Sequence, residues 1–189
     1  MLSQSQIALI RDSAVAPVAG GNIFYALDEF GSRTYSNSDG TRDWTGDWVE
    51  SGDSSGATGG DVQVTSDLVR NYVLEVSNAN NQVERQVDLA DCSTLSVTTE
   101  YRQVGLDPGL WIWPPDEVAI EVSVDGGTNW ETLTKFVGPA TNLIYASGSW
   151  TAASRPSADT RIRIRSNDRL SSSDQVFFDN FKVQGSGCE

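Results

Sequence analysis

The chain contains no histidine, only two cysteines, one methionine and little lysine among its 189 residues. Without an imidazole it lacks the general base of Ser-His-Asp and Cys-His catalysis and the commonest metal ligand. No apolar run approaches the ~20 residues that a membrane-spanning helix needs, so we expect no membrane insertion. Any hydrolytic chemistry would have to depend on carboxylates alone.

Basic residues are scarce as well. Lys and Arg number 13 against 26 Asp and Glu, which gives a formal net charge of -13. Proteins bind nucleic acids and anionic membranes through clustered Lys and Arg that displace counterions. We therefore expect no nucleic-acid partner.

The carboxylates do not supply a hydrolase geometry. Glu117 and Glu121 lie four residues apart on one face of a predicted strand, which separates them by roughly 13 Å at ~3.3 Å per residue. The two carboxylates of glycosidases are about 5 to 9.5 Å apart. We predict that the protein is not an enzyme.

From residue 22 onward, short alternating segments are separated by Gly, Asn, Asp, Ser and Pro, a pattern typical of antiparallel β-structure. The length suits one domain with a sizeable core. The sequence predicts an all-β fold, a two-sheet antiparallel β-sandwich of the jelly-roll type, with no helix. The expected strands are 22–30, 47–50, 61–65, 69–77, 81–89, 93–104, 117–124, 129–137, 142–150, 159–166 and 174–184.

Two of these strands show the alternation most clearly. Val118, Ile120, Val122 and Val124 share one face of residues 117–124. In residues 160–166 the isoleucines point inward and three arginines point outward. Such an arginine row is typical of a solvated face with carboxylate partners, here expected from Glu117 and Glu121, and an anion site is the alternative.

The ends of the chain differ from its middle. We expect residues 1–21 to form an N-terminal extended segment, residues 22–185 the sandwich domain, and residues 186–189 a C-terminal tail. The apolar residues 5–18 need a partner, which leaves three possibilities: a strand of the domain's own sheet, a linker, or a donor strand that completes a neighbour's sheet. The last would make the protein self-assemble.

Residues 123–130, Ser-Val-Asp-Gly-Gly-Thr-Asn-Trp, predict a β-hairpin turn. Asp125 can accept the turn's own backbone N–H groups, and Gly126 and Gly127 tolerate positive φ. The spacing resembles the Asp-box hairpin of sialidases and many other secreted β-proteins, where it stiffens a turn and performs no chemistry.

Cys92 and Cys188 lie at predicted strand edges. Their position suits a disulfide that ties the C-terminal tail to the sandwich. Two unpaired thiols, or a bond from Cys188 to another chain, are the alternatives.

Several motifs occur in an order that resembles a known family. The chain is similar over residues 27–184 to the MAM-like or carbohydrate-binding-like jelly-roll modules of bacterial secreted and surface proteins. The resemblance implies a two-sheet jelly roll with a role in binding, adhesion or spacing. It also implies a structural calcium ion that joins the N-terminal segment to the last strand. The motifs are residues 27–30, 35–41, 44–48, 85–89, 118–130 and 176–183.

Calcium needs six to eight oxygen ligands, which carboxylates from separate loops can supply. The resemblance places Asp28 and Asp179 together at one edge of the sandwich, and Asp39 is the third candidate. Asp39 is equally suited to capping a turn, and Asp179 to pairing with an arginine.

Residues 105–116 depart from the family pattern, because they add Trp111, Ile112 and Trp113. These side chains are costly to expose unless a sugar face, a neighbouring subunit or the domain's own surface covers them. We expect Trp111 and Trp113 to be the ligand-binding residues of an extracellular or cell-surface module that contacts a glycan or a surface protein. The alternative is a structural subunit of a surface filament joined by strand donation.

Overall fold

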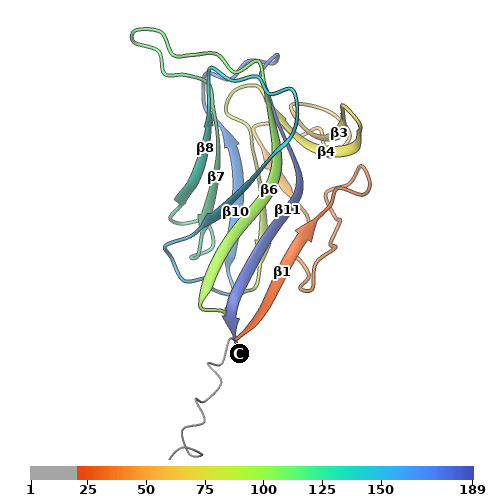
Figure 1. Ribbon diagram of the computed structural model, residues 1–189, viewed down its shortest axis with the longest axis vertical. Coiled ribbons are helices and arrows are strands. Elements are labelled where there is room, and N and C mark those ends of the chain that lie inside the picture. The colour runs from red at the N-terminus through yellow and green to blue at the C-terminus, as the bar shows by residue number, and fades with distance from the viewer. Residues whose placement is uncertain (1–20) are drawn as a thin grey trace, which may run out of the picture.

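The computed structural model describes residues 21–189, which form eleven β-strands and no helix. The strands pack as two antiparallel sheets, face to face (Figure 1), so the predicted fold class is confirmed. Since residues 21–189 hold no helix, none in this part of the chain is long and apolar enough to cross a membrane. The strands are β1 (Asn22–Asp28), β2 (Val49–Ser51), β3 (Val62–Asp67), β4 (Arg70–Ser77), β5 (Gln82–Val87), β6 (Thr94–Val104), β7 (Glu117–Ser123), β8 (Glu131–Val137), β9 (Ala146–Thr151), β10 (Thr160–Ser166) and β11 (Gln175–Cys188).

One sheet has six strands, in the order β3-β4-β11-β6-β9 with β1 also paired to β11, and the other has five, in the order β2-β5-β10-β7-β8. The first and last described strands are therefore neighbours, with Asn22 opposite Cys188 and Asp28 opposite Phe181. Because β11 runs to Cys188, residues 186–188 are part of this strand and not of a separate tail. The predicted N-terminal segment, including residues 5–18, lies outside the described residues.

The core lies between the sheets and is built by alternation. Val118, Ile120 and Val122 of β7 and Ile162 and Ile164 of β10 are all buried. Every second side chain of a strand points to the same face, so these β-branched residues meet the inner face of the six-stranded sheet. The inward positions expected for both strands are confirmed, except for Val124, which lies beyond the end of β7 and is half-buried. On the opposite face of β7, Ala119, Glu121 and Ser123 are buried as well.

Strand β9 begins four residues later than the sequence predicts, the largest such difference among the strands. Residues 142–145 were expected at the start of β9, but β9 is Ala146–Thr151. The Asn142 N–H donates to the carbonyl of Gln103 at 2.8 Å, and the Tyr145 hydroxyl donates to Asp67 at 2.9 Å. These contacts hold the segment as a loop against the end of the six-stranded sheet.

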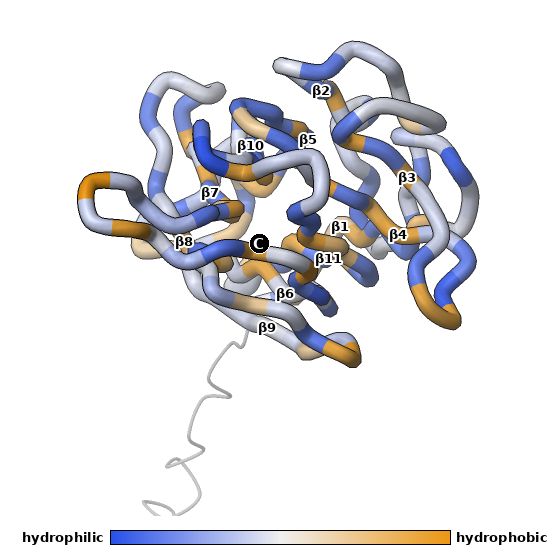
Figure 2. The backbone as a smooth tube through the Cα atoms, turned by 90° about the horizontal axis from the view of Figure 1, so that it is seen from above, coloured by the Kyte–Doolittle hydropathy of each residue, from blue (hydrophilic) through white to orange (hydrophobic). Residues whose placement is uncertain are grey.

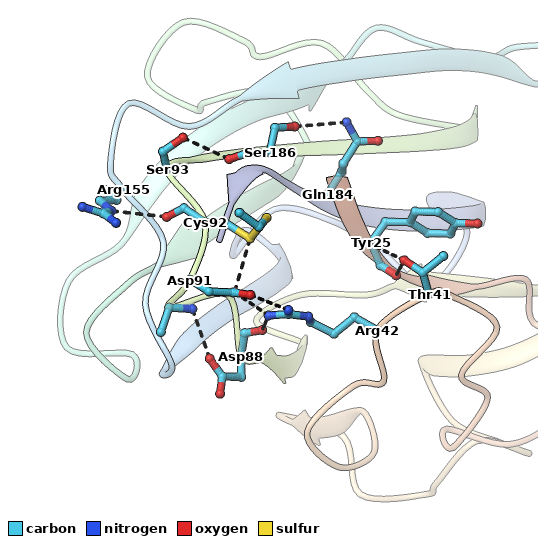
Figure 3. The surroundings of a disulfide bond; sticks show 12 residues. Tyr25, Thr41, Arg42, Asp88, Asp91, Cys92, Ser93, Arg155, Gln184 and Ser186 are labelled. Carbon is cyan, nitrogen blue, oxygen red and sulfur yellow. Dashed lines mark hydrogen bonds and ion pairs between the residues drawn. A yellow bond between two sulfur atoms is a disulfide. The ribbon is translucent and has the colours of Figure 1, made fainter. Parts of the chain in front are cut away.

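The Cys92–Cys188 disulfide joins the end of β11 to the segment that precedes β6 (Figure 3). Both cysteines are buried. Beside the disulfide, the Arg42 guanidinium forms an ion pair with Asp91 at 2.7 Å. The bond closes 96 residues of chain and confirms the pairing expected from the sequence.

The turn between β7 and β8 is held by its own side chains. The Ser123 hydroxyl accepts the Gly127 N–H at 2.8 Å, and the Asp125 carboxylate accepts the Asn129 N–H at 2.8 Å and its side-chain amide at 2.6 Å. The Trp130 indole N–H donates to the carbonyl of Gly127 at 2.9 Å. The predicted hairpin is present, and its polar groups stabilise the turn itself.

We expect the Asp125 carboxyl to titrate with a pKa of about 2, because the hydrogen bonds from Asn129 favour the charged form. An aspartate in an unfolded chain titrates near ~3.9. Because the folded pKa is the lower one, these bonds stabilise the protein above the unfolded value, and that stabilisation is lost as the pH falls toward 2. Carboxyl carbon-13 NMR of the folded protein measures the midpoint. The Ser123 hydroxyl also donates to the Asp125 carboxylate at 2.7 Å, so the Ser123→Ala variant should titrate at a higher pH. A wild-type midpoint near that of the unfolded chain would contradict the expectation.

Candidate functional site

Residues 105–116, here called the tryptophan loop, project from the sandwich between β6 and β7. The loop is the green segment beyond the upper end of β7 and β8 in Figure 1. Trp111 is fully exposed at 104% and Trp113 is 55% exposed, with Leu110 and Ile112 also exposed. Figure 2 shows the hydrophobic colouring on this loop beside β7. Both predicted ligand-binding residues therefore face solvent, and the sandwich does not cover them.

The tip of the tryptophan loop is ordered by backbone hydrogen bonds. The Trp113 N–H donates to the carbonyl of Leu110 at 2.8 Å, and the Leu110 N–H donates back to the carbonyl of Trp113 at 3.1 Å. Trp111 has a φ of 50°, a left-handed conformation that is rare for a bulky residue. The Arg169 guanidinium lies 4.4 Å from the centre of the Trp113 ring. The backbone of the loop tip is thus ordered, and the Trp113 ring is held by its contact with Arg169.

Three carboxylates lie at the base of the tryptophan loop. The Asp107 N–H donates to the Asp116 carboxylate at 2.6 Å, which closes the two ends of the loop against each other. Carboxylate oxygens of Asp107, Asp116 and Asp174 all lie within 4.8 Å of one another, and Asp116 and Asp174 are buried. Burial, followed by the neighbouring carboxylates, raises the pKa of Asp116. Such a group can share a proton or hold a hard cation.

Sequence reasoning missed this cluster. Asp107 and Asp116 lie in one loop, but Asp174 lies just before β11, and only the pairing of β11 with β6 brings it close. No spacing in the sequence signals that approach.

Asp28, one of the three predicted calcium ligands, lies in the core. Its carboxylate accepts hydrogen bonds from the Phe30 N–H at 2.8 Å and the Trp48 indole at 2.9 Å, and it pairs with Arg85 at 2.9 Å. Burial raises the pKa of Asp28 and lowers the pKa of Arg85. The rings of Trp44 and Trp48 lie against the Arg85 guanidinium, at 4.9 and 5.8 Å. The arrangement is a hydrogen-bonded ion pair enclosed by aromatic rings.

Asp179 and Asp39 have other partners. Arg70 forms an ion pair with Asp179 and another with Glu100 at 2.8 Å, so the arginine alternative stated for Asp179 is present. The Asp39 carboxylate accepts the Glu29 N–H at 3.0 Å and so fixes the chain after β1. The three carboxylates do not form one group, and calcium binding by them stays a prediction.

The outer face of the five-stranded sheet carries the arginine row. Arg163 and Arg165 both pair with Glu121, at 2.6 and 3.0 Å, and Arg161 pairs with Glu84 on β5 at 2.7 Å. The expected Glu121 partner is confirmed. Glu117, the other expected partner, instead pairs with Lys135 at 3.0 Å.

The remaining tryptophans belong to the core or its edge. Trp44 and Trp48 are buried. Trp130 packs under the Arg163 guanidinium at 3.9 Å, and Trp150 packs edge-on against Phe136 at 5.9 Å. Trp111 and Trp113 are therefore the exposed tryptophans of residues 21–189.

Comparison with known proteins shows which solved structures have a similar fold. No protein-family model and no curated protein matched the chain. Among solved structures, it is similar to the CBM22-1 xylan-binding domain from Paenibacillus barcinonensis Xyn10C, with a TM-score of 0.52 and 12% identity over 90% of this chain and 97% of that one. It is also similar to TmCBM61 in complex with beta-1,4-galactotriose, with a TM-score of 0.50 and 14% identity over 82% of this chain and 92% of that one. A mutant of CBM29-2, a family 29 carbohydrate-binding module, has a TM-score of 0.50 and 10% identity over 88% of this chain and 87% of that one. The chain thus shares the jelly-roll fold of these modules.

Proposed function

We propose that the protein is a non-enzymatic carbohydrate-binding module that acts outside the cell and contacts glycan through the tryptophan loop. The observation that carries this proposal is the exposure of Trp111 and Trp113 on a loop with ordered backbone contacts. Flat aromatic faces pack against the C–H faces of sugar rings, and a loop with an ordered backbone loses less freedom on binding. The loop therefore suits a preformed contact surface for a glycan.

Three further features support the proposal. The jelly-roll fold is shared with a xylan-binding domain and with a module solved with beta-1,4-galactotriose. A disulfide is typical of proteins that leave the reducing cytosol. The carboxylates Glu117 and Glu121 are engaged in ion pairs on a sheet surface, which supports a role in binding over a role in catalysis.

The alternative of a filament subunit depends on residues 5–18, which lie outside the described residues. No observation on residues 21–189 favours it. The other binding role for the tryptophan loop is contact with a surface protein, that is, adhesion.

Replacing Trp111 and Trp113 with alanine should lower glycan affinity by about tenfold or more, since truncation of exposed aromatic anchors has effects of this size. The thermal midpoint should stay unchanged, because both rings lie outside the core. The measurement is retention on a glycan array that includes xylo-oligosaccharides and beta-1,4-galactotriose, run with calcium and with a chelator.

Val69→Ala is the matched control, because Val69 is 98% exposed on the β3–β4 turn. It should bind as the wild type does. An array without signal in both buffers, or a double variant that binds as well as the wild type, would reject the tryptophan loop as the glycan site.

A further inference from the structure

A groove of about 300 Å³ crosses the outer face of the six-stranded sheet. It spans four neighbouring strands, β1, β11, β6 and β9, on the face opposite to the core. The volume is at the lower end of the range for small-molecule pockets, about 300 to 1,000 Å³. Its main side chains are Leu27, Thr98, Glu100, Ser147, Asn180 and Lys182.

Register brings these side chains together. Thr98 on β6 lies opposite Lys182 on β11, and Lys182 lies opposite Leu27 on β1. Glu100 lies opposite Ser147 on β9. Directly opposed residues share one face of an antiparallel sheet, so their side chains converge over the groove.

A β-bulge shapes one side of the groove. The pairing of β11 with β6 shifts between Asp179 and Lys182, and Asn180 in the bulge has a φ of 49°. Its side-chain amide donates to the Glu100 carboxylate at 2.7 Å, and Arg70 donates to the same oxygen at 2.8 Å. Bulges re-aim side chains in this way. Glu100 is thus held as a carboxylate acceptor at the groove.

The groove retains unused hydrogen-bonding groups. Within residues 21–189, the Thr98 and Ser147 hydroxyls and the second carboxylate oxygen of Glu100 make no hydrogen bond to another side chain or to backbone. Lys182 forms no ion pair there, and its ammonium group lies 5.6 Å from the centre of the Tyr25 ring. Donors, acceptors and the apolar Leu27 side chain therefore alternate around one small space.

That mixture matches a particular ligand chemistry. A neutral sugar ring has adjacent hydroxyls that both donate and accept, together with an apolar C–H face. A ligand carboxylate could pair with Lys182, but Glu100 beside it would repel that charge. The groove therefore favours a neutral sugar over an acidic one.

We infer that this groove is a second saccharide site, which takes one or two neutral sugar units and is separate from the tryptophan loop. The inference extends the proposed function and rests on it for the ligand class. It makes the module bivalent, with contacts on a loop and on a sheet face, and two sites on one chain raise the avidity for a long polysaccharide.

The test uses the full chain with Trp111→Ala and Trp113→Ala, so that only the groove can bind. Xylobiose, beta-1,4-galactobiose and digalacturonic acid are titrated by saturation-transfer NMR. At least one neutral disaccharide should bind, and Lys182→Met in this background should weaken its binding about tenfold. Lys135→Met is the matched control, because Lys135 is the other lysine of the chain and lies on the five-stranded sheet.

Three results would overturn the inference: no neutral disaccharide binds, digalacturonic acid alone binds, or Lys182→Met changes binding no more than Lys135→Met does. A different result would reject the proposed function. It requires that the chain with Trp111→Ala and Trp113→Ala bind glycan more weakly than the wild type does.

Discussion

Replacing Asp28 with alanine should lower the free energy of unfolding by about 3 to 5 kcal/mol, since this leaves a buried charge without its partner. Arg85 is almost fully buried and pairs with Asp28 at 2.9 Å. The same substitution removes the acceptor of the Phe30 and Trp48 N–H groups. Urea unfolding followed by tryptophan fluorescence measures the loss.

Asp168→Ala is the control for this prediction, because Asp168 is exposed and forms no ion pair within residues 21–189. It should change stability by less than ~0.5 kcal/mol. Adding Arg85→Met to Asp28→Ala should restore part of the loss, because the unpaired charge is then gone. A single Asp28→Ala variant within ~1 kcal/mol of the wild type would contradict the account of the ion pair.

Replacing Cys92 and Cys188 with alanine should lower the free energy of unfolding by about 4 to 5 kcal/mol. The bond closes 96 residues, and the loop-entropy model gives about 4.7 kcal/mol for a loop of ~100 residues. The fold should remain, since the packed core of both sheets is unchanged. Thermal and urea unfolding of the double variant, with and without reductant, measure the difference.

The wild type in reductant should match the double variant, and the double variant itself should not respond to reductant. A wild type that loses no stability on reduction would show that the Cys92–Cys188 bond does not constrain the unfolded chain.

The sequence predicts the fold well because alternation has a single physical meaning in a half-buried strand. Ile162 and Ile164 can be assigned to the core and Arg163 to the surface without knowing any partner strand. The hairpin at Asp125 is equally local, because all of its bonds lie within a few residues.

Pairings between distant residues were harder to predict. Asp28 pairs with Arg85, which lies 57 residues away on another sheet, and no spacing in the sequence signals that pairing. The Asp107, Asp116 and Asp174 cluster and the groove at Lys182 likewise depend on which strands are neighbours and in what register. Alternation alone does not specify either property.

The exposed tryptophans were predictable from the sequence in part. The sequence singles out Trp111 and Trp113 because they interrupt a family pattern in a loop, and their exposure agrees with that expectation. The proposal that they contact a glycan rests on the chemistry of the indole face, and it is the claim on which the proposed function depends.

Indole N–H spectra of the six tryptophans test that claim most directly, because each ring gives its own nitrogen-15 signal. On titration with xylo-oligosaccharides or beta-1,4-galactotriose, the signals of Trp111 and Trp113 should shift while those of the buried Trp44 and Trp48 stay in place. Shifts confined to other tryptophans, or no shift with any glycan that the protein retains, would contradict binding through the tryptophan loop.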